Sequence, residues 1–477
     1  MFVRASIAGG RVVEPQRELP VVADVDVVVA GGGPASLGAA VAAARCGART
    51  LLIERNGFLG GAATAGLMAM WNASLDTSTG FAHELIARLI REGGALSGPA
   101  TPFDPEKLKE VALDIVLEAG VQPLFYTNCA APILDGRRVA GVVLESKSGR
   151  QAALAKVVVD CTGDADIAAA AGVPCVKGRE RDGKMRPVSV IFRMGGIDVR
   201  EMVEFARAHP EDFTADPTFQ LLDIDRGLVR VFGFFREVED ARMRGELDPE
   251  CHYLRFEGVD VARGTAFVNS TRVYGVDGTQ AGDLTRAEIE ARRQMRQLVS
   301  FIKTLPGCEN AYVLETSASI GVRETRRIRG EAVLTEEDIA AGKTYEDTVA
   351  RLFRRGEIGI ETHSPDGGEG AAGDVAWRKI HWPLTSYELP YGSLVPLEID
   401  GLLVGGRCIS QTHEADKYTR SMHCCMVIGQ AAGAAASLAA AAGVQPRALD
   451  RLALQRTLLS QGVDLGQQTE RVRSSLS

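Results

Sequence analysis

The chain has 477 residues, of which 45% are hydrophobic and 24% are charged, and its formal net charge is −8 at pH 7. This composition is typical of a folded globular protein and excludes a disordered chain. The length exceeds what one hydrophobic core usually supports, so we expect two domains. The negative charge, without a long cluster of lysine and arginine, excludes nucleic acid as a partner.

Cysteine usage and the N-terminal segment predict a cytoplasmic location. The nine cysteines include no CxxC pair, which is the spacing that metal sites and redox motifs often use. We therefore expect reduced thiols and no bound metal. Residues 1–20 contain no continuous apolar stretch, so they do not resemble a secretory signal.

Residues 25–54 read as a buried strand, a glycine turn, a helix of small residues and a second strand that ends on an acid. Gly31 permits the tight turn, and Gly33 lets the backbone approach a pyrophosphate at the positive N-terminus of the helix. Glu54 follows Gly33 by about 20 residues, the spacing at which a carboxylate binds an adenosine ribose. Ser36 replaces the third glycine of the usual GxGxxG. The residues expected to contact a dinucleotide are Gly31, Gly33, Pro34, Ala35, Ser36 and Glu54.

A second GxGxxG match lies at residues 368–373. The residues before it, 361–366, read as a turn rather than a buried strand, so the context that gives the motif its meaning is missing. We predict a loop there and no second nucleotide-binding domain.

The rest of the chain predicts a sheet that is interrupted and later completed. Over residues 121–172, short apolar runs between turn signals predict a β-meander that rejoins the parallel sheet at 157–160. From about residue 186 charged and aromatic residues become more frequent, and an apolar strand pattern resumes after Tyr391. We therefore predict an α/β fold with a Rossmann-like domain, made of a parallel sheet plus a β-meander. An inserted mixed α+β substrate domain interrupts it.

The predicted domain boundaries follow from these changes in composition and hydrophobic pattern. Residues 1–185 form the first part of the cofactor-binding domain, 186–388 the inserted substrate domain, 389–445 the final strand and helix of the cofactor-binding domain, and 446–477 a C-terminal helical tail. Each part is assigned from composition and hydrophobic pattern.

Residues 422–444 form an uncharged stretch with Gly429 and Gly433 in GxxxG spacing, so a membrane span is an alternative. The stretch is rich in alanine and glycine and also contains His423 and Gln430. We therefore predict a fully buried helix and no membrane span.

Three further segments predict that the dinucleotide is FAD. FAD is longer than NAD, so distant chain segments must meet its isoalloxazine end. A glycine-rich connection at 55–66 follows the ribose acid, residues 160–164 close one predicted strand, and 405–407 end another. The helix that begins near Cys424 would aim its positive N-terminus at the ring. The further expected cofactor contacts are Arg55, Gly60, Gly61, Ala62, Ala63, Ala130, Thr162, Gly163, Asp164, Gly406, Arg407, Cys425 and Met426.

Taken together, these segments resemble a known family. Those at 31–48, 55–66, 157–172, 319–339 and 402–439 are similar to the FAD-dependent oxidoreductase family. That family lies within the glutathione-reductase-type two-domain flavoproteins and is distantly related to the fumarate reductase flavoproteins. The resemblance implies FAD, a Rossmann-like domain interrupted by a substrate domain, and hydride chemistry at flavin N5. Two positions depart from the family pattern: Ser36, and Gly392, where relatives often carry a basic residue.

A cluster of polar residues precedes the last predicted helix. It contains His413, Arg420 and His423. Because hydride removal needs a proton acceptor and often a cation that orients the substrate, we assign Arg420 as a substrate clamp and His423 or His413 as the acid/base. The alternative stays open that Arg420 caps a turn or pairs with Glu414 and that the histidines are structural.

Three further candidates lie elsewhere in the chain. Arg323 could bind substrate, and an ion pair with Glu324 is the alternative interpretation. His363 reads as a loop residue near the domain junction, with ordinary loop packing as its alternative, and Tyr391 could donate a phenolic hydrogen bond.

These residues predict an FAD-dependent oxidoreductase that transfers a hydride from a small organic substrate to flavin N5, as a dehydrogenase or oxidase. The substrate would be a hydroxy or amino compound that carries a carboxylate. Reduction of an activated C=C bond, a flavin monooxygenase and a non-catalytic flavin protein stay open as alternatives. The expected partners are a small-molecule substrate and an electron acceptor, either oxygen or a redox partner. A homo-oligomer is compatible with the sequence.

Overall fold

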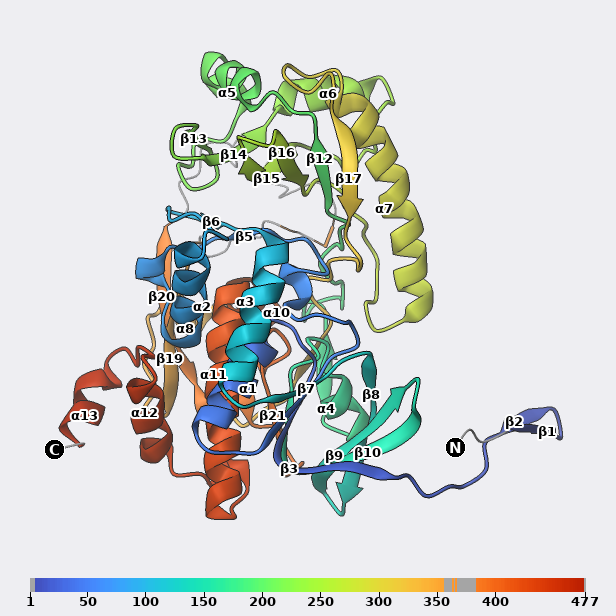
Figure 1. The fold of residues 1–477 in the computed structure, drawn as a ribbon, viewed down its shortest axis with the longest axis vertical. Coiled ribbons are helices and arrows are strands. Elements are labelled where there is room, and N and C mark those ends of the chain that lie inside the picture. Colours follow the sequence, from blue (N-terminus) through green and yellow to red (C-terminus); the bar gives the residue numbers. More distant parts are fainter. Residues whose placement is uncertain (1–4, 356–362, 364, 367–382, 476–477) are drawn as a thin grey trace.

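The computed structural model describes residues 5–355, 363, 365–366 and 383–475. The second GxGxxG match at 368–373 lies outside the described residues. The chain forms two units, with the N-terminal and C-terminal parts in one and residues from the middle of the chain in the other (Figure 1).

A seven-stranded sheet forms the centre of the larger unit. Its strand order is β7-β4-β3-β10-β9-β8, and β21 also pairs with β10. The pairs β3 with β4, β4 with β7, β3 with β10 and β10 with β21 are all parallel. The bounds are β3 Val21–Ala30, β4 Thr50–Ile53, β7 Gln122–Leu124, β8 Thr127–Asp135, β9 Arg138–Ser146, β10 Gly149–Asp160 and β21 Leu402–Val404.

Strand β10 joins the predicted β-meander to the parallel sheet. Its first half pairs antiparallel with β9, which pairs antiparallel with β8. Its last residues, 158–160, lie between β3 and β21 in parallel register. The predicted return of the meander to the sheet at 157–160 is therefore confirmed.

Helices α1 (Pro34–Arg45) and α11 (Met422–Ala442) lie side by side and pack on the sheet. Their backbones approach closely, because a Cβ atom on Gly429 would lie 1.8 Å from the Ala35 carbonyl oxygen. On Gly433 it would lie 2.0 Å from the carbonyl oxygen of Ala39, and on Gly38 2.0 Å from that of Met426. The GxxxG spacing thus serves packing inside the protein. Helix α11 is long and apolar enough to cross a membrane, yet 89% of its most apolar window is buried inside the protein.

The smaller unit contains a six-stranded antiparallel sheet with strand order β13-β14-β15-β16-β12-β17. It has its own core, in which Phe192, Phe234 and Phe256 are fully buried. The bounds are β12 Phe192–Gly195, β13 Leu221–Asp223, β14 Leu228–Gly233, β15 Leu254–Asp260, β16 Thr265–Val268 and β17 Tyr312–Thr316, with helices α5 Val199–Ala208, α6 Phe235–Met243 and α7 Ala281–Ile302.

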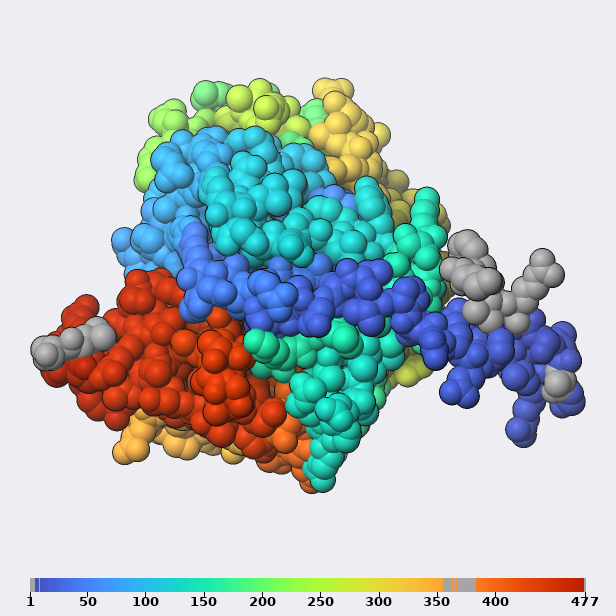
Figure 2. Space-filling view, turned by 60° about the horizontal axis from the view of Figure 1, so that its bottom comes forward, coloured from blue at the N-terminus to red at the C-terminus, as the bar shows by residue number. Residues whose placement is uncertain are grey.

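The remaining elements pack mainly on the larger unit. Ile328, Leu352 and Tyr387 belong to the core of the larger unit, although they fall within residues 186–388, the predicted inserted domain. The division of the chain into domains stays a prediction. The N-terminal hairpin extends away from the body (Figure 2). The bounds are β1 Ser6–Ala8, β2 Arg11–Val13, β5 Met70–Trp71, α2 Gly80–Arg91, β6 Thr101–Pro102, α3 Pro105–Glu118, α4 Asp166–Ala170, β11 Cys175–Lys177, β18 Arg326–Ile328, α8 Glu336–Ala340, β19 Thr348–Arg355, β20 Leu384–Pro390, α10 His413–Thr419, α12 Arg451–Ser460 and α13 Gln468–Ser474.

Candidate functional site

Two cavities that share a wall lie between the ends of the parallel strands and the smaller unit. The first cavity is built on the carboxyl ends of β3, β4, β10 and β21, which is where open α/β sheets bind ligands. Its lining includes Gly31, Gly33, Pro34, Ala35, Glu54, Arg55, Gly61, Ala62, Thr162, Gly163, Asp164, Gly406, Arg407 and Cys425.

The glycine turn after β3 offers bare backbone to the first cavity. Gly31 has a φ of 100°, and a Cβ there would lie 2.7 Å from the Cys161 carbonyl oxygen, so only glycine fits. A Cβ on Gly61 would lie 2.8 Å from the Cα of Gly33, whereas a Cβ on Gly33 would meet no atom within 4 Å. Gly33 is the N-cap of α1, so this open space faces the positive end of a helix dipole. A pyrophosphate fits this cradle.

Glu54 lies beside the glycine turn with its carboxylate oriented by three hydrogen bonds. Its Oε2 accepts from the backbone N–H of Gly32 at 2.7 Å, and its Oε1 accepts from the backbone N and side-chain Nδ2 of Asn56 at 2.8 Å and 2.7 Å. Each carboxylate oxygen can accept more than one hydrogen bond. Glu54 therefore retains acceptor capacity for ribose hydroxyl groups, as an adenine dinucleotide requires.

Segments from distant parts of the chain close the far end of the first cavity. Arg407 donates to Asp164 Oδ1 at 2.6 Å, which ties the segment after β21 to the turn after β10. Asp160 holds that turn by accepting from the backbone N–H groups of Thr162 and Ala168 at 3.0 Å and 2.9 Å. The first turn of α11 also lines the cavity through Met422 and Cys425. An elongated site built from these segments fits FAD.

Five of the predicted cofactor contacts do not line the first cavity: Ser36, Gly60, Ala63, Ala130 and Met426. Ser36 is fully buried, and its hydroxyl donates to the Cys161 carbonyl oxygen at 3.5 Å. The close helix contact that a third glycine would serve is made by Gly38 instead. Sequence reasoning missed other lining residues, which include Asn56, Thr127, Asn128, Cys129, Ser319, Ile320, Gly321 and Val322.

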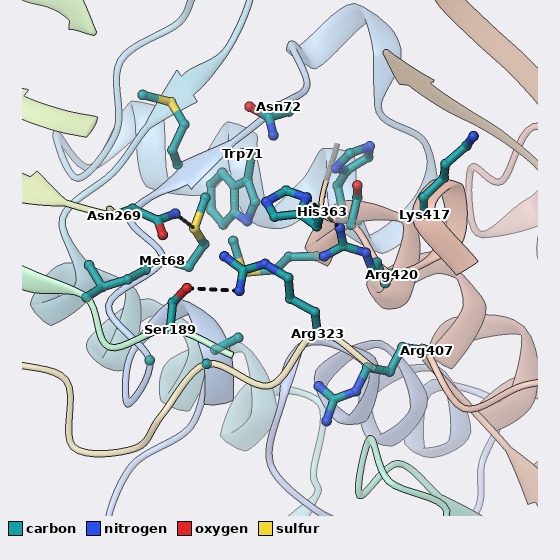
Figure 3. A pocket seen from close by; sticks show the side chains of 18 of the residues that line it. Met68, Trp71, Asn72, Ser189, Asn269, Arg323, His363, Arg407, Lys417 and Arg420 are labelled. Atoms are coloured by element: carbon teal, nitrogen blue, oxygen red, sulfur yellow. Dashed lines mark hydrogen bonds between the residues drawn. The ribbon is translucent and has the colours of Figure 1, made fainter. Parts of the chain in front are cut away.

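The second cavity, with a volume of about 200 Å³, lies between the first cavity and the sheet of the smaller unit (Figure 3). Within the part of the chain that the structure describes, no aspartate or glutamate lines it. Its cationic lining residues are Arg255, Arg323, Arg354, Arg407, Lys417 and Arg420. The wall shared with the first cavity consists of Ala62, Gly66, Gly321, Val322, Arg407, Arg420 and Met422.

Arg323 and Arg420 both lie in this cavity. Arg323 donates to the Pro187 carbonyl oxygen at 2.6 Å and to Ser189 Oγ at 2.9 Å. Glu324, the alternative partner considered for Arg323, instead contacts His413 Nδ1 at 2.8 Å. Its buried carboxylate also lies 3.4 Å from an Arg186 nitrogen. The segment after β17 thus sends Arg323 toward the cavity and Glu324 into the core.

Arg420 lies between His363 and a buried carboxylate. Its Nη2 is 3.4 Å from His363 Nδ1, and its Nε is 3.7 Å from Asp416 Oδ2. The contact expected in the alternative interpretation was with Glu414, whereas the nearby carboxylate is that of Asp416, one helical turn before Arg420. Asp416 is itself held by Arg186 Nη1 at 2.8 Å.

Both histidines that line the second cavity have a lowered pKa. Burial, together with the positive charges of Arg323 and Arg420, lowers the pKa of His363 well below its usual range. Burial lowers the pKa of His423 to about 4, although its hydrogen bond to Phe353 opposes this. Its Nε2 lies 3.0 Å from the Phe353 carbonyl oxygen and therefore donates, which leaves Nδ1 as an acceptor. Both imidazoles are neutral near pH 7.

Two predicted catalytic residues lie outside both cavities. His413 is buried, and its Nδ1 lies 2.8 Å from Glu324 Oε1, within a cluster of buried charged side chains. Tyr391 is fully buried, and its hydroxyl donates to the Pro446 carbonyl oxygen at 3.0 Å. We therefore leave His413 and Tyr391 out of the proposed substrate site.

Several residues that line the second cavity were not predicted from the sequence. Trp71 comes from β5, Arg354 from β19, and Asn269 follows β16 in the smaller unit. None of them belongs to a motif, and only the packing of the two units brings them together. The burial of Cys425 raises its thiol pKa to about 12, so a thiolate at the start of α11 is not favoured.

Comparison with known proteins shows the family. The profile described as FAD dependent oxidoreductase matches residues 26–458. Thiamine thiazole synthases of Methanococcus vannielii and Methanococcus maripaludis are 32% and 31% identical over 159 and 160 residues, which is 30% of this chain in both cases. The chain spans 58% and 57% of the length of these two curated relatives.

Two of the similar solved structures show a distant likeness. A geranylgeranyl bacteriochlorophyll reductase-like protein from Thermoplasma acidophilum is 12% identical with a TM-score of 0.46, over 95% of this chain and 96% of that chain. A triple mutant of the flavin-dependent brominase Bmp2 is 12% identical with a TM-score of 0.47, over 91% and 84%. Since the family profile spans most of the sequence, the chain belongs to the FAD-dependent oxidoreductase family.

Proposed function

We propose that this enzyme oxidises a small organic molecule that carries a carboxylate, with the substrate in the second cavity and FAD in the first. The observation that carries the proposal is the wall shared by the two cavities, which includes Arg407 and Arg420. A carboxylate bound there would hold the neighbouring carbon close to the flavin. When bound, FAD supplies the hydride acceptor at N5.

The electrostatics of the second cavity favour an anionic substrate. Among the described residues, the charged side chains that line it are all cationic. Burial lowers the pKa of His363 most, and the charges of Arg323, Arg420, Arg272 and Arg255 lower it further. A planar guanidinium binds a carboxylate through paired hydrogen bonds. We assign Arg323 and Arg420 to bind the substrate carboxylate.

A neutral imidazole in the second cavity is compatible with oxidation of the substrate. Substrate oxidation by hydride transfer also releases a proton, which a neutral imidazole can accept. His423 is neutral near pH 7, and its Nδ1 has no hydrogen-bond partner among the described residues. We therefore assign His423 as the proton acceptor.

Anaerobic mixing tests this proposal. The holoenzyme is mixed with 2-hydroxy and 2-amino acids and with the corresponding amides, and loss of the yellow flavin absorbance is followed. We expect acids to bleach the flavin and amides to do so much more slowly. The variant Arg420→Gln should lower kcat/KM for the acids by roughly 10- to 100-fold, because it loses a charged hydrogen bond to the substrate carboxylate. The matched control Arg292→Gln changes an arginine on α7 with a 41% exposed side chain and should have no effect.

Other outcomes would overturn the proposal. Reoxidation of chemically reduced enzyme by an enoate, without bleaching by any acid, would indicate reduction of a C=C bond. Oxygen incorporation that depends on NAD(P)H would indicate a monooxygenase. Bleaching by amides as fast as by acids would remove the role of the arginines.

A further inference from the structure

One side of the second cavity has a different character from the cationic side. Asn269 and Met68 lie at the left of the view in Figure 3, and Arg407 and Arg420 lie at the right. We define the tail subsite by the lining residues Met68, Met70, Trp71, Ile191, Phe219 and Asn269. None of these lines the first cavity, so the tail subsite lies on the side of the second cavity away from the shared wall.

The orientation of the Asn269 amide is fixed by its neighbours. Its Nδ2 donates to Glu257 Oε2 at 3.4 Å and lies 3.5 Å from Met68 Sδ. Burial opposes ionisation of Glu257, but the charges of Arg255 and Arg230 lower its pKa, so its carboxylate accepts only. Arg230 holds the other oxygen of Glu257 at 2.6 Å. The amide oxygen of Asn269 therefore points away from Glu257.

This amide oxygen is a buried acceptor that needs a donor. Asn269 is 3% exposed, and its Oδ1 has no hydrogen-bond partner among the residues that the structure describes. A buried polar atom left without a partner costs free energy, so such atoms usually receive a ligand or a water molecule.

Trp71 presents a donor in the same subsite. Its ring stacks on Phe103 with centroids 4.1 Å apart, and it is 1% exposed. The indole Nε1, which can only donate, also has no partner within the described part of the chain. The subsite thus combines an apolar wall with one fixed acceptor and one fixed donor.

We propose that the substrate carries an apolar tail, aromatic in the simplest case, that ends in a hydroxyl group recognised by Trp71 and Asn269. This inference rests on the proposed function, which places the carboxylate at Arg323 and Arg420. A hydroxyl group can both accept from an N–H and donate to an amide oxygen. Arg255 lies beside the tail subsite, with its Nε 3.6 Å from the Glu257 carboxylate that Arg230 also contacts.

The test uses two acids that differ only in this hydroxyl group, 3-(4-hydroxyphenyl)lactate and 3-phenyllactate. For each acid, the change in the absorbance of oxidised flavin gives the Kd, and anaerobic bleaching gives kcat/KM. We expect the hydroxylated acid to be preferred roughly tenfold or more in both measurements, because a site built for a hydroxyl rejects its isostere. The variants Asn269→Leu and Trp71→Phe should reduce that preference to near one.

Asn310→Leu, at an exposed position of the smaller unit, is the matched control and should keep the preference. Equal Kd values for the two acids in the unmodified enzyme, or a preference that survives both variants, would overturn the inference. Tight binding of the hydroxylated acid without any bleaching would instead contradict the proposed oxidation and leave the tail subsite supported.

Discussion

His423 links the stability of the enzyme to pH, and the size of the effect follows from its burial. The pKa of His423 is about 4 in the folded protein, against an ordinary value of 6.5. Between these values the unfolded chain binds a proton that the folded protein does not, so stability rises with pH and is lost as pH falls from 6.5 toward 4. From about pH 7 to about pH 5, His423 alone should cost about 2 kcal/mol of unfolding free energy.

The assay compares urea unfolding of the unmodified holoenzyme and the variant His423→Gln at both pH values, with FAD in constant excess. Glutamine is neutral and can still donate to the Phe353 carbonyl oxygen, so the variant should lose about 2 kcal/mol less than the unmodified enzyme over this pH change. The control His83→Gln removes a histidine on the exposed face of α2. An equal pH dependence in the unmodified enzyme and His423→Gln would refute the assignment of a neutral buried imidazole.

Two further predictions concern the cofactor domain. Gly429→Ala places a Cβ 1.8 Å from the Ala35 carbonyl oxygen and should destabilise the protein by about 1–3 kcal/mol or more. Gly282→Ala, in a helix where the added Cβ meets no atom within 4 Å, should not destabilise it, and equal melting temperatures for both variants would contradict the packing argument. Glu54→Gln removes the charge that orients the ribose site and should raise the Kd of FAD, measured by flavin fluorescence, by roughly tenfold; an unchanged Kd would show that Glu54 does not contact the ribose.

The parts of the fold that local sequence determines were predictable. The segment from β3 to β4 could be predicted as a dinucleotide-binding unit, because the glycine turn, the helix and the acid follow one another along the chain. Each of them is required by the chemistry of one βαβ unit. The same holds for the buried helix α11, whose polar and small residues argued against a membrane span. The Gly429 and Gly433 pair was visible, but its partner helix α1 lies some 400 residues earlier in the chain and could not be read from the spacing.

The substrate cavity was less predictable, because its residues meet only when the two units pack. Asn269 and Trp71 have ordinary sequence surroundings, and their unpartnered polar atoms exist only in the folded protein. Tyr391 shows the opposite case: the sequence suggested that its phenol could donate a hydrogen bond at the site, but its hydroxyl donates to the Pro446 carbonyl oxygen. The placement of Arg420 and His423 beside the proposed site could be predicted, because they lie directly before and within the first turn of α11.

Arg420 lines both the proposed anion-binding cavity and the cavity that fits FAD. The most direct measurement is a titration of the oxidised holoenzyme with phenylacetate and with phenylacetamide, followed by the change in flavin absorbance. We expect phenylacetate to perturb the flavin absorbance and to bind more weakly to Arg420→Gln, whereas phenylacetamide should bind poorly to both proteins. Equal binding of the acid and the amide, or binding of the acid that Arg420→Gln leaves unchanged, would contradict this expectation.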